Sequence, residues 1–179
     1  MATESGQGAR RVFFALWPDE AVAAQLFQTG AAAHAGCGGR RMRRETLHLT
    51  LAFIGAVAPE RVEVLAGIGA AIRQPGFSFT LDRLRCVPRK HIVWAASATP
   101  PPALAQLAAE LHECLAAADF PIEVRPFAAH VTLLRNARCD AAPPQAPCIE
   151  WPVRDIVLVQ SQADAAGAAY RIIGRWALA

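Results

Sequence analysis

The sequence predicts an α+β protein with two pseudo-symmetric lobes, each an antiparallel sheet with helices on its outer face. The main observation is a short pattern that occurs twice, His48-Leu49-Thr50-Leu51 and His130-Val131-Thr132-Leu133, with the two histidines 82 residues apart. Each copy lies in an apolar, strand-like run, and helical and strand-like segments alternate around it in a loosely repeated order. Two similar halves facing each other would bring both His-x-Thr motifs into one central cleft.

Each motif combines an imidazole with a hydroxyl on one face of its strand. Side chains alternate between the two faces of a β-strand, so His48 and Thr50 share one face, as do His130 and Thr132. The leucines and valine between them then pack behind that face. One such histidine is as readily explained by a half-buried strand position, but the pair indicates a catalytic constellation.

Length and composition predict one globular domain. With 179 residues and 54% hydrophobic residues, the chain can bury a sizeable core. Its apolar runs are too short to span a bilayer, and its first residues carry Glu4 and no apolar stretch, so we expect neither membrane association nor a signal peptide. We expect a flexible N-terminal tail over residues 1–10 and a single bilobal domain over residues 11–179, present as a monomer in the cytoplasm.

The cysteines and basic residues bear on compartment and ligand. Five cysteines form an odd number without C-x-x-C spacing, which argues against a disulfide framework or a zinc ribbon and favours the reducing cytosol. Of the 18 basic residues, 17 are arginine, whose planar fork matches phosphate oxygens and would suit RNA or a nucleotide. An alanine-rich chain that uses arginine in place of lysine also follows from genome composition, and we prefer that explanation for most of these arginines.

The first half of the chain is predicted to lead from a strand and a helix into the first motif. Aromatic and β-branched residues mark the first strand, an Asp or Pro opens the helix, and a glycine stops it. The elements are a strand over 11–17, a helix from Pro18 or Asp19 to Gly36, a basic loop over 38–44, the motif strand over 47–54, and a helix from Pro59 to about Gln74.

The second half is predicted to repeat this order and to end in a hairpin. A half-exposed strand over 77–81 is expected to pair with residues 92–98 across a turn at Pro88-Arg89-Lys90. The remaining elements are a helix from Leu104 to about Asp119, the second motif strand ending at Arg135, a proline-rich loop over 141–147, and a closing hairpin of residues 156–160 and 170–176.

The motifs resemble those of a known family. HLTL at 48–51 and HVTL at 130–133 are similar to the paired H-x-T-x motifs of the 2H phosphoesterase superfamily. More narrowly, the chain resembles the bacterial and archaeal RNA 2′,3′-cyclic phosphodiesterases, also called 2′-5′ RNA ligases. RVFFALWP, LHLTLAFIG, RPF, VLVQS and the Tyr170-Arg171 strand follow one another in the family's order over nearly the whole chain.

Two positions depart from the family pattern. The approach to the first motif is Arg41-Met42-Arg43 where the family usually has Arg-Trp-Val, so an aromatic side chain is absent. The approach to the second motif is Phe127-Ala128-Ala129 where the family usually has Phe-Arg-Pro, so an arginine and a proline are absent.

The resemblance implies an enzyme that hydrolyses RNA 2′,3′-cyclic phosphodiester ends to 2′-phosphomonoesters, together with reversible 2′-5′ RNA ligation, in which an RNA 5′-hydroxyl takes the place of water. His130 is then the proton acceptor and His48 the proton donor to O3′, without a metal or another cofactor. Thr50 and Thr132 would donate to the phosphate oxygens. The partners are RNA or nucleotides with 2′,3′-cyclic phosphate ends, and the implied substrate contacts are Arg135, Arg41 and Phe127.

Two alternatives remain open from the residues alone. A metal-dependent phosphodiesterase could use both histidines as ligands, although neither His-x-Thr strand carries an Asp, Glu or Cys as the third ligand that a catalytic zinc site takes. A non-catalytic RNA- or nucleotide-binding module would use the arginines, and its binding would weaken steeply with salt.

Overall fold

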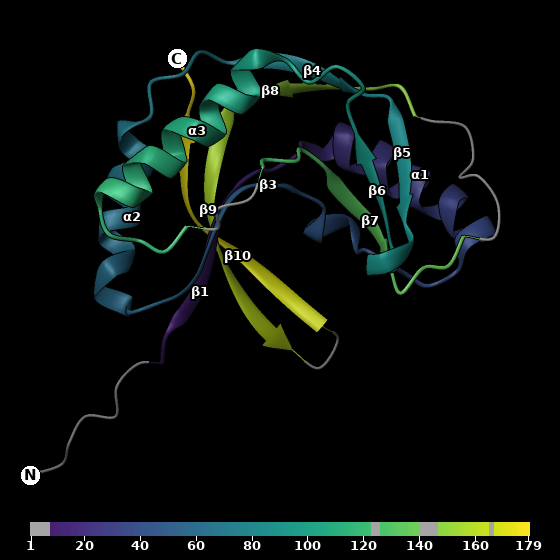
Figure 1. Cartoon of the computed structure of the whole chain (residues 1–179), viewed down its shortest axis with the longest axis horizontal. Helices are drawn as coiled ribbons and strands as arrows, with labels where there is room; N and C mark the ends of the chain where they lie inside the picture. Colours follow the sequence, from purple (N-terminus) through teal and green to yellow (C-terminus); the bar gives the residue numbers. More distant parts are fainter. Residues whose placement is uncertain (1–7, 123–125, 140–146, 165–166) are drawn as a thin grey trace, which may run out of the picture.

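One long antiparallel sheet forms the frame of the molecule (Figure 1). The computed structural model describes residues 8–122, 126–139, 147–164 and 167–179. The strands are β1 (Arg10–Leu16), β2 (Arg40–Arg41), β3 (Leu49–Val57), β4 (Phe77–Leu81), β5 (Arg83–Val87), β6 (Ile92–Ala96), β7 (Val131–Arg135), β8 (Ile149–Val153), β9 (Asp155–Asp164) and β10 (Gly167–Ala177). The helices are α1 (Glu20–Cys37), α2 (Val62–Ala71) and α3 (Pro102–Ala117), with 3-10 turns at Arg44–Thr46, Pro59–Arg61 and Pro88–Lys90.

The large sheet consists of two halves that meet at the motif strands. Its order is β10-β9-β1-β3-β7-β6-β5, β2 also pairs with β7, and β4 and β8 form a separate two-stranded sheet. Strands β3 and β7 pair where Leu49 lies opposite Val131, and each of these residues directly follows a motif histidine. The predicted α+β class with antiparallel sheets is confirmed, and the two lobes share one sheet.

Two helices each cover the back of the motif strand that belongs to the other half of the sequence. Helix α1 follows β1 in the chain but packs against β7, where Gly30 lies against the side chain of Leu133. Helix α3 precedes β7 but packs against β3, and α2 packs against β9 and β10. Both motif strands are therefore held from behind by the helix that belongs to the other half of the sequence.

Local sequence signals explain the ends of α1. The Asp19 carboxylate accepts a hydrogen bond of 2.9 Å from the Val22 N–H, which caps the first turn as predicted. The helix continues one residue beyond the predicted stop at Gly36. It ends at Cys37 because Gly38 takes a positive φ of 57°, a conformation that glycine adopts without a steric penalty.

The predicted partner of the strand over 77–81 is wrong. Strand β4 pairs with β8, where Phe79 stacks on Trp151 with ring centroids 5.5 Å apart. The hairpin partner of β6 is β5, a strand that the sequence analysis missed, as it missed β8. The chain leaves β4 at Asp82, whose carboxylate accepts a 2.6 Å hydrogen bond from the Ala98 N–H, and the following residues enter the large sheet.

The other predicted elements lie close to their expected positions. The helix from Pro59 begins as a 3-10 turn and ends at Ala71, three residues early. The closing hairpin is formed by β9 and β10. Most of the predicted tail and of the proline-rich loop fall on residues 1–7 and 140–146, which lie outside the described residues, while Arg10 belongs to β1. Within the described ranges, no helix combines the length and apolar composition that a membrane crossing requires.

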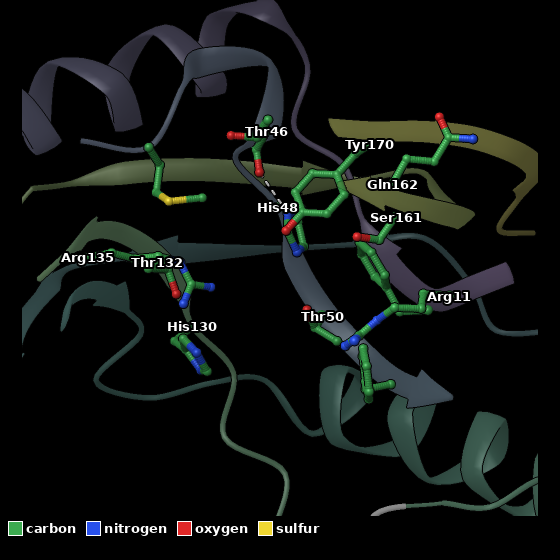
Figure 2. A pocket seen from close by; sticks show the side chains of 13 residues that line it. Arg11, Thr46, His48, Thr50, His130, Thr132, Arg135, Ser161, Gln162 and Tyr170 are labelled. Carbon is green, nitrogen blue, oxygen red and sulfur yellow. Dashed lines mark hydrogen bonds between the residues drawn. The ribbon is translucent and has the colours of Figure 1, made fainter. Parts of the chain in front are cut away.

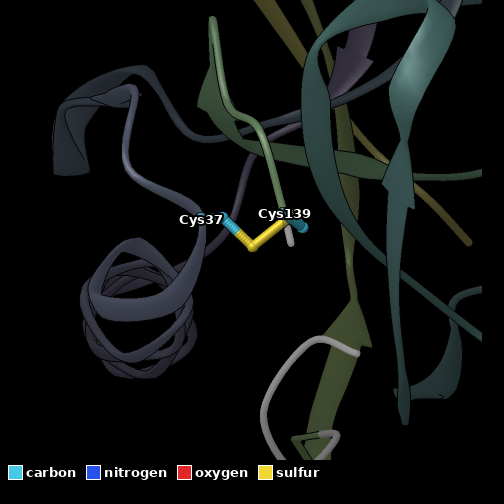
Figure 3. The surroundings of a disulfide bond; sticks show 2 residues. All are labelled: Cys37 and Cys139. Atoms are coloured by element: carbon cyan, nitrogen blue, oxygen red, sulfur yellow. A yellow bond between two sulfur atoms is a disulfide. The ribbon is translucent and has the colours of Figure 1, made fainter. Parts of the chain in front are cut away.

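A disulfide joins Cys37 at the end of α1 to Cys139 beyond β7 (Figure 3). Because the two cysteines are 102 residues apart, their spacing carried no sign of pairing, and the argument against disulfides is wrong for this pair. The Arg138 N–H also donates to the Cys37 carbonyl at 2.8 Å, and a Cβ at Gly39 would clash with the backbone of Arg135 and Ala137. These contacts hold the end of β7.

The disulfide predicts a thiol count and a loss of stability. Three cysteines are free, Cys86, Cys114 and Cys148, so the unreduced, denatured protein should titrate three thiols. Closing a loop of this length restricts the unfolded chain, so Cys37→Ser should lower the free energy of unfolding by about 2–4 kcal/mol in urea denaturation. The exposed Cys148→Ser should leave it unchanged. Five titratable thiols, or equal stability of both variants, would contradict the bond.

Candidate active site

Both predicted motifs line one open pocket of about 630 Å³ at the junction of β3 and β7. Figure 2 shows the His48 and His130 side chains entering it from these two parts of the chain. A pocket of this size suits a nucleotide-sized ligand. It is lined by Arg11, Phe13, Met42, Thr46, His48, Thr50, Phe53, His130, Thr132, Arg135, Ser161, Gln162 and Tyr170.

The two histidines make the same hydrogen bond. The Nδ1 atom of His48 lies 2.7 Å from the Thr46 carbonyl oxygen, and Nδ1 of His130 lies 2.7 Å from the Ala128 carbonyl oxygen. A carbonyl oxygen only accepts, so Nδ1 carries the hydrogen in both rings, and a neutral ring then has an unprotonated Nε2. Each ring contacts the carbonyl two residues before it and lies one residue before its strand, not within the strand as predicted.

Aromatic side chains enclose His48. Trp17 stacks on the imidazole with ring centroids 5.4 Å apart and planes within 5°, Phe13 lies at 4.9 Å, and Tyr170 meets it edge-on at 5.1 Å. Burial lowers the pKa of His48 from 6.5 to about 4; the hydrogen bond to Thr46 opposes this shift, and the charge of Arg135 adds to it. His48 is therefore neutral at pH 7.

His130 has a similar but more open environment. The Trp94 ring packs on it with centroids 4.2 Å apart. Burial lowers the pKa of His130 below 6.5, the hydrogen bond to Ala128 opposes the shift, and the positive charges of Lys90 and Arg135 lower the pKa further. The pocket thus holds two neutral imidazoles at pH 7, and both rings have an unprotonated nitrogen available to a proton.

The charges around the pocket favour an anionic ligand. Arg11 and Arg135 belong to its lining, and no Asp or Glu does among the described residues. The Arg11 guanidinium lies 5.7 Å from the centre of the Phe53 ring, which is 44% exposed. Positive charge beside an open aromatic face is a suitable environment for a phosphate with an attached base.

The residues of the pocket are poor in metal ligands. Among the residues that the structure describes, its lining offers two imidazoles and neither a carboxylate nor a thiol. Across the residues that the structure describes, no three His, Cys, Asp or Glu side chains gather in a way that could hold an ion. A catalytic zinc site takes three protein ligands and keeps a fourth position open, so this donor set does not fit one.

The structure brings five of the seven predicted site residues into the pocket. His48, Thr50, His130, Thr132 and Arg135 all line it.

The other two predicted residues, Arg41 and Phe127, do not line the pocket. The guanidinium of Arg41 lies over the Phe27 ring at 4.8 Å, on α1, and Phe127 packs against the hydrophobic core. The structure gives no support for their predicted contacts with substrate. Met42, at the position where the family pattern has an aromatic residue, does line the pocket.

Strands β1, β9 and β10 also contribute side chains to the pocket, which the sequence did not indicate. Arg11 is paired with Ser161, and Ser161 with Tyr170, so these three side chains share one face of the sheet. Their segments, RVFFALWP, VLVQS and the Tyr170-Arg171 strand, are among those that resemble the family. Alternation alone could not decide which face of these strands meets the motifs, because that depends on the register between strands far apart in the sequence.

The family follows from comparison with known proteins. A family model described as LigT like phosphoesterase matches residues 16–94 and 96–170 of the chain. The chain belongs to the LigT-like phosphoesterase family. Each matched segment contains one H-x-T motif.

Relatives within the LigT-like phosphoesterases match over nearly the full chain. An Escherichia coli protein named RNA 2′,3′-cyclic phosphodiesterase is 34% identical over 171 residues, which covers 94% of this chain and 97% of that protein. A Thermus thermophilus protein of the same name is 29% identical over 94% of this chain and 90% of that protein. The crystal structure of E. coli LigT complexed with 3′-AMP aligns with a TM-score of 0.87 at 33% identity, over 95% of this chain and 98% of that one.

The buried, neutral His48 predicts acid-sensitive folding. Its pKa is about 4 in the folded protein and 6.5 as its ordinary value, so the unfolded chain binds one more proton between these pH values. The free energy of unfolding should therefore fall as pH decreases from about 6.5 to 4. In urea denaturation, His48→Gln should reduce the loss between pH 7 and pH 4 by about 3 kcal/mol. His112→Gln, on α3 outside the pocket, is the control. Parallel pH dependence of wild type and His48→Gln would contradict the prediction.

Proposed function

We propose that this chain hydrolyses the 2′,3′-cyclic phosphate ends of RNA to 2′-phosphomonoesters, without a metal ion, through His48 and His130. The observation that carries the proposal is the matched pair of imidazoles, both held through Nδ1 and both lining one pocket, whose described lining residues include arginines and no carboxylate. The names of the E. coli and Thermus relatives and the 3′-AMP complex of E. coli LigT support the same substrate class.

The reaction needs a base and an acid on opposite sides of one phosphorus atom. The oxygen of water attacks phosphorus in line with O3′, His130 Nε2 takes the water proton, and the bond from phosphorus to O3′ breaks. His48 then gives its proton to O3′, and the phosphate stays on O2′. The lowered pKa of His130 suits the base, because this ring is neutral at pH 7 before substrate binds.

The acid role of His48 requires a proton that the free protein does not hold at pH 7. The cyclic phosphodiester carries a negative charge, and an anion in contact with a buried imidazole favours its charged form. Burial strengthens this effect, because little water separates the ring from the ligand. Substrate binding therefore raises the pKa of His48, and its proton is taken up with the substrate.

Neighbouring side chains stabilise the phosphate and hold the nucleoside. Thr50 and Thr132 donate their hydroxyl hydrogens to the non-bridging oxygens, whose charge grows in the transition state. Arg135 lies close enough to influence both imidazoles and balances that charge. The exposed ring of Phe53, beside Arg11, offers a face on which a base stacks.

The decisive test is hydrolysis of a nucleoside 2′,3′-cyclic phosphate in excess EDTA, with identification of the product. We expect a 2′-phosphate, a decrease in kcat of at least about a hundredfold for His48→Ala and for His130→Ala, and smaller decreases for Thr50→Ala and Thr132→Ala. His112→Ala serves as the control. A 3′-phosphate product would reverse the leaving-group assignment, and unchanged turnover in either histidine variant would refute the mechanism.

The uptake of a proton on His48 predicts different pH profiles for kcat and kcat/KM. The kcat/KM profile reports the free protein, so it should decrease as pH rises above the low pKa of His48. The kcat profile reports the complex, in which the bound anion raises that pKa, so its decrease should occur at least about one pH unit higher. Descending limbs at the same pH in both profiles would show that the substrate does not protonate His48.

The same experiments separate the alternatives. Loss of activity in EDTA would favour a metal-dependent phosphodiesterase, and RNA binding with a steep salt dependence but no product would favour a binding module. In 2′-5′ ligation, an RNA 5′-hydroxyl replaces water as the group that attacks phosphorus, His130 takes its proton, and the bond from phosphorus to O3′ again breaks. We propose that the same residues catalyse both reactions, and formation of a 2′-5′ linked product from 5′-hydroxyl RNA and RNA with a 2′,3′-cyclic phosphate end would test this.

A further inference from the structure

A second pocket lies on the other side of His130. It has a volume of about 290 Å³, and His130 belongs to its lining as well as to that of the main pocket. The two pockets therefore adjoin at the residue that we propose to activate the attacking group. Its other polar or aromatic lining residues are Arg83, Arg85, Trp94 and Ser97.

The register of the sheet puts the second pocket on the same face as the motifs. Arg85 is paired with Trp94, and Trp94 with Thr132, across the neighbouring strands β5, β6 and β7 (Figure 1). Paired residues of antiparallel strands point to the same face, so these three side chains form a row. The row ends at Thr132, which we propose as a hydrogen-bond donor to the phosphate. Arg83 lies two residues before Arg85 and shares its face.

The distance between β5 and β7 suits two ligand groups that are one unit apart along a polymer. Neighbouring strands are about 4.8 Å apart, so the backbone of β5 lies roughly 10 Å from that of β7. The long arginine side chains shorten this distance toward His130, whose pocket they line. A ligand held between the two histidines could thus extend into the second pocket without leaving the face of the sheet.

The charge of the second pocket has no other structural role among the described residues. Arg83 and Arg85 are exposed, and within the described ranges neither guanidinium takes part in a hydrogen bond or an ion pair. The adjacent carboxylate, Asp82, accepts the Ala98 N–H. Two available guanidinium groups, each with a planar fork that matches phosphate oxygens, make an anion the suitable ligand.

We propose that the Arg83–Arg85 pocket binds a phosphodiester group of RNA one nucleotide away from the phosphate that reacts. This inference rests on the proposed function and narrows the substrate to RNA chains over mononucleotides. Arginine contacts to the backbone carry no base preference, so the pocket favours chain length and not sequence.

Two sources can supply this phosphodiester. In hydrolysis it is the group 5′ to the terminal nucleoside of the same RNA. In ligation it belongs to a second strand, whose 5′-hydroxyl approaches the phosphorus from the side of His130. The chemistry of recognition is the same, and the two sources differ in which substrate responds to loss of the arginines.

The test compares a nucleoside 2′,3′-cyclic phosphate with a dinucleotide that ends in the same group and contains one phosphodiester. The variants are Arg83→Gln with Arg85→Gln in one protein, Arg85→Lys as the charge-preserving variant, and Arg154→Gln as a matched loss of an exposed arginine between β8 and β9. The wild type should prefer the dinucleotide in kcat/KM.

The double variant should lose about tenfold or more in kcat/KM on the dinucleotide, and stay within about twofold of wild type on the mononucleotide. Arg85→Lys should retain part of the preference, and Arg154→Gln all of it. The dependence of log KM on log salt should become shallower by about 0.7 for each lost phosphate contact. A loss restricted to the KM of a 5′-hydroxyl RNA in ligation also supports the pocket and assigns it to the attacking strand.

Equal losses on both substrates, or no loss in hydrolysis and ligation, would overturn the proposal. Failure of the wild type to turn over either substrate would count against the proposed function instead. In that case, calorimetric binding of a dinucleotide with a terminal 2′-phosphate, against a nucleoside 2′-phosphate, still tests the pocket. Tighter binding of the dinucleotide by the wild type, lost in the double variant, would support the pocket. Equal affinity of the wild type for the two ligands would contradict it.

Discussion

The site depends on one hydrogen bond that the chain makes twice, from the Nδ1–H of a histidine to the carbonyl oxygen two residues before it. This bond fixes the tautomer of both rings, so that each has Nε2 available in the pocket. It also holds the ring just before the strand begins, where Leu49 and Val131 pair and join the halves of the sheet. Two equivalent imidazoles then line the same pocket from different halves, as acid–base catalysis at a single phosphorus atom requires.

The exchange of helices between the halves ties the integrity of this site to the whole fold. Because α1 supports β7 and α3 supports β3, neither motif strand is backed only by its own part of the sequence. The disulfide between Cys37 and Cys139 adds a covalent link at the end of β7, near Arg135. The aromatic rings around His48 come from β1, from Trp17 directly after it and from β10, and burial is the main cause of its lowered pKa. Structure that lies far from the motifs in sequence therefore sets their protonation state.

The sequence was sufficient where the signal is local. Period-two alternation in both motifs predicted that His48 and Thr50, and their counterparts, meet one cleft, and apolar periodicity located the helices within a few residues. It was insufficient where the outcome depends on long-range pairing. Tertiary packing decides which strand pairs with β4 and which face of the strands that carry Arg11 and Tyr170 meets the pocket. It also brings together the two cysteines of the disulfide, which are 102 residues apart. The structure also gives no support for the substrate contact that the resemblance implied for Arg41, since its guanidinium lies over the Phe27 ring and not in the pocket.

The most direct test of the central claim is a long-range ¹H–¹⁵N NMR correlation of the histidine rings at pH 7 in the unliganded protein. The Nδ1 hydrogen bonds and the lowered pKa values predict that His48 and His130 are both neutral, with the hydrogen on Nδ1 and a bare Nε2. Assignment of the two signals through His48→Gln and His130→Gln completes the measurement. A hydrogen on Nε2 in either ring, or a charged ring before ligand binds, would contradict the account.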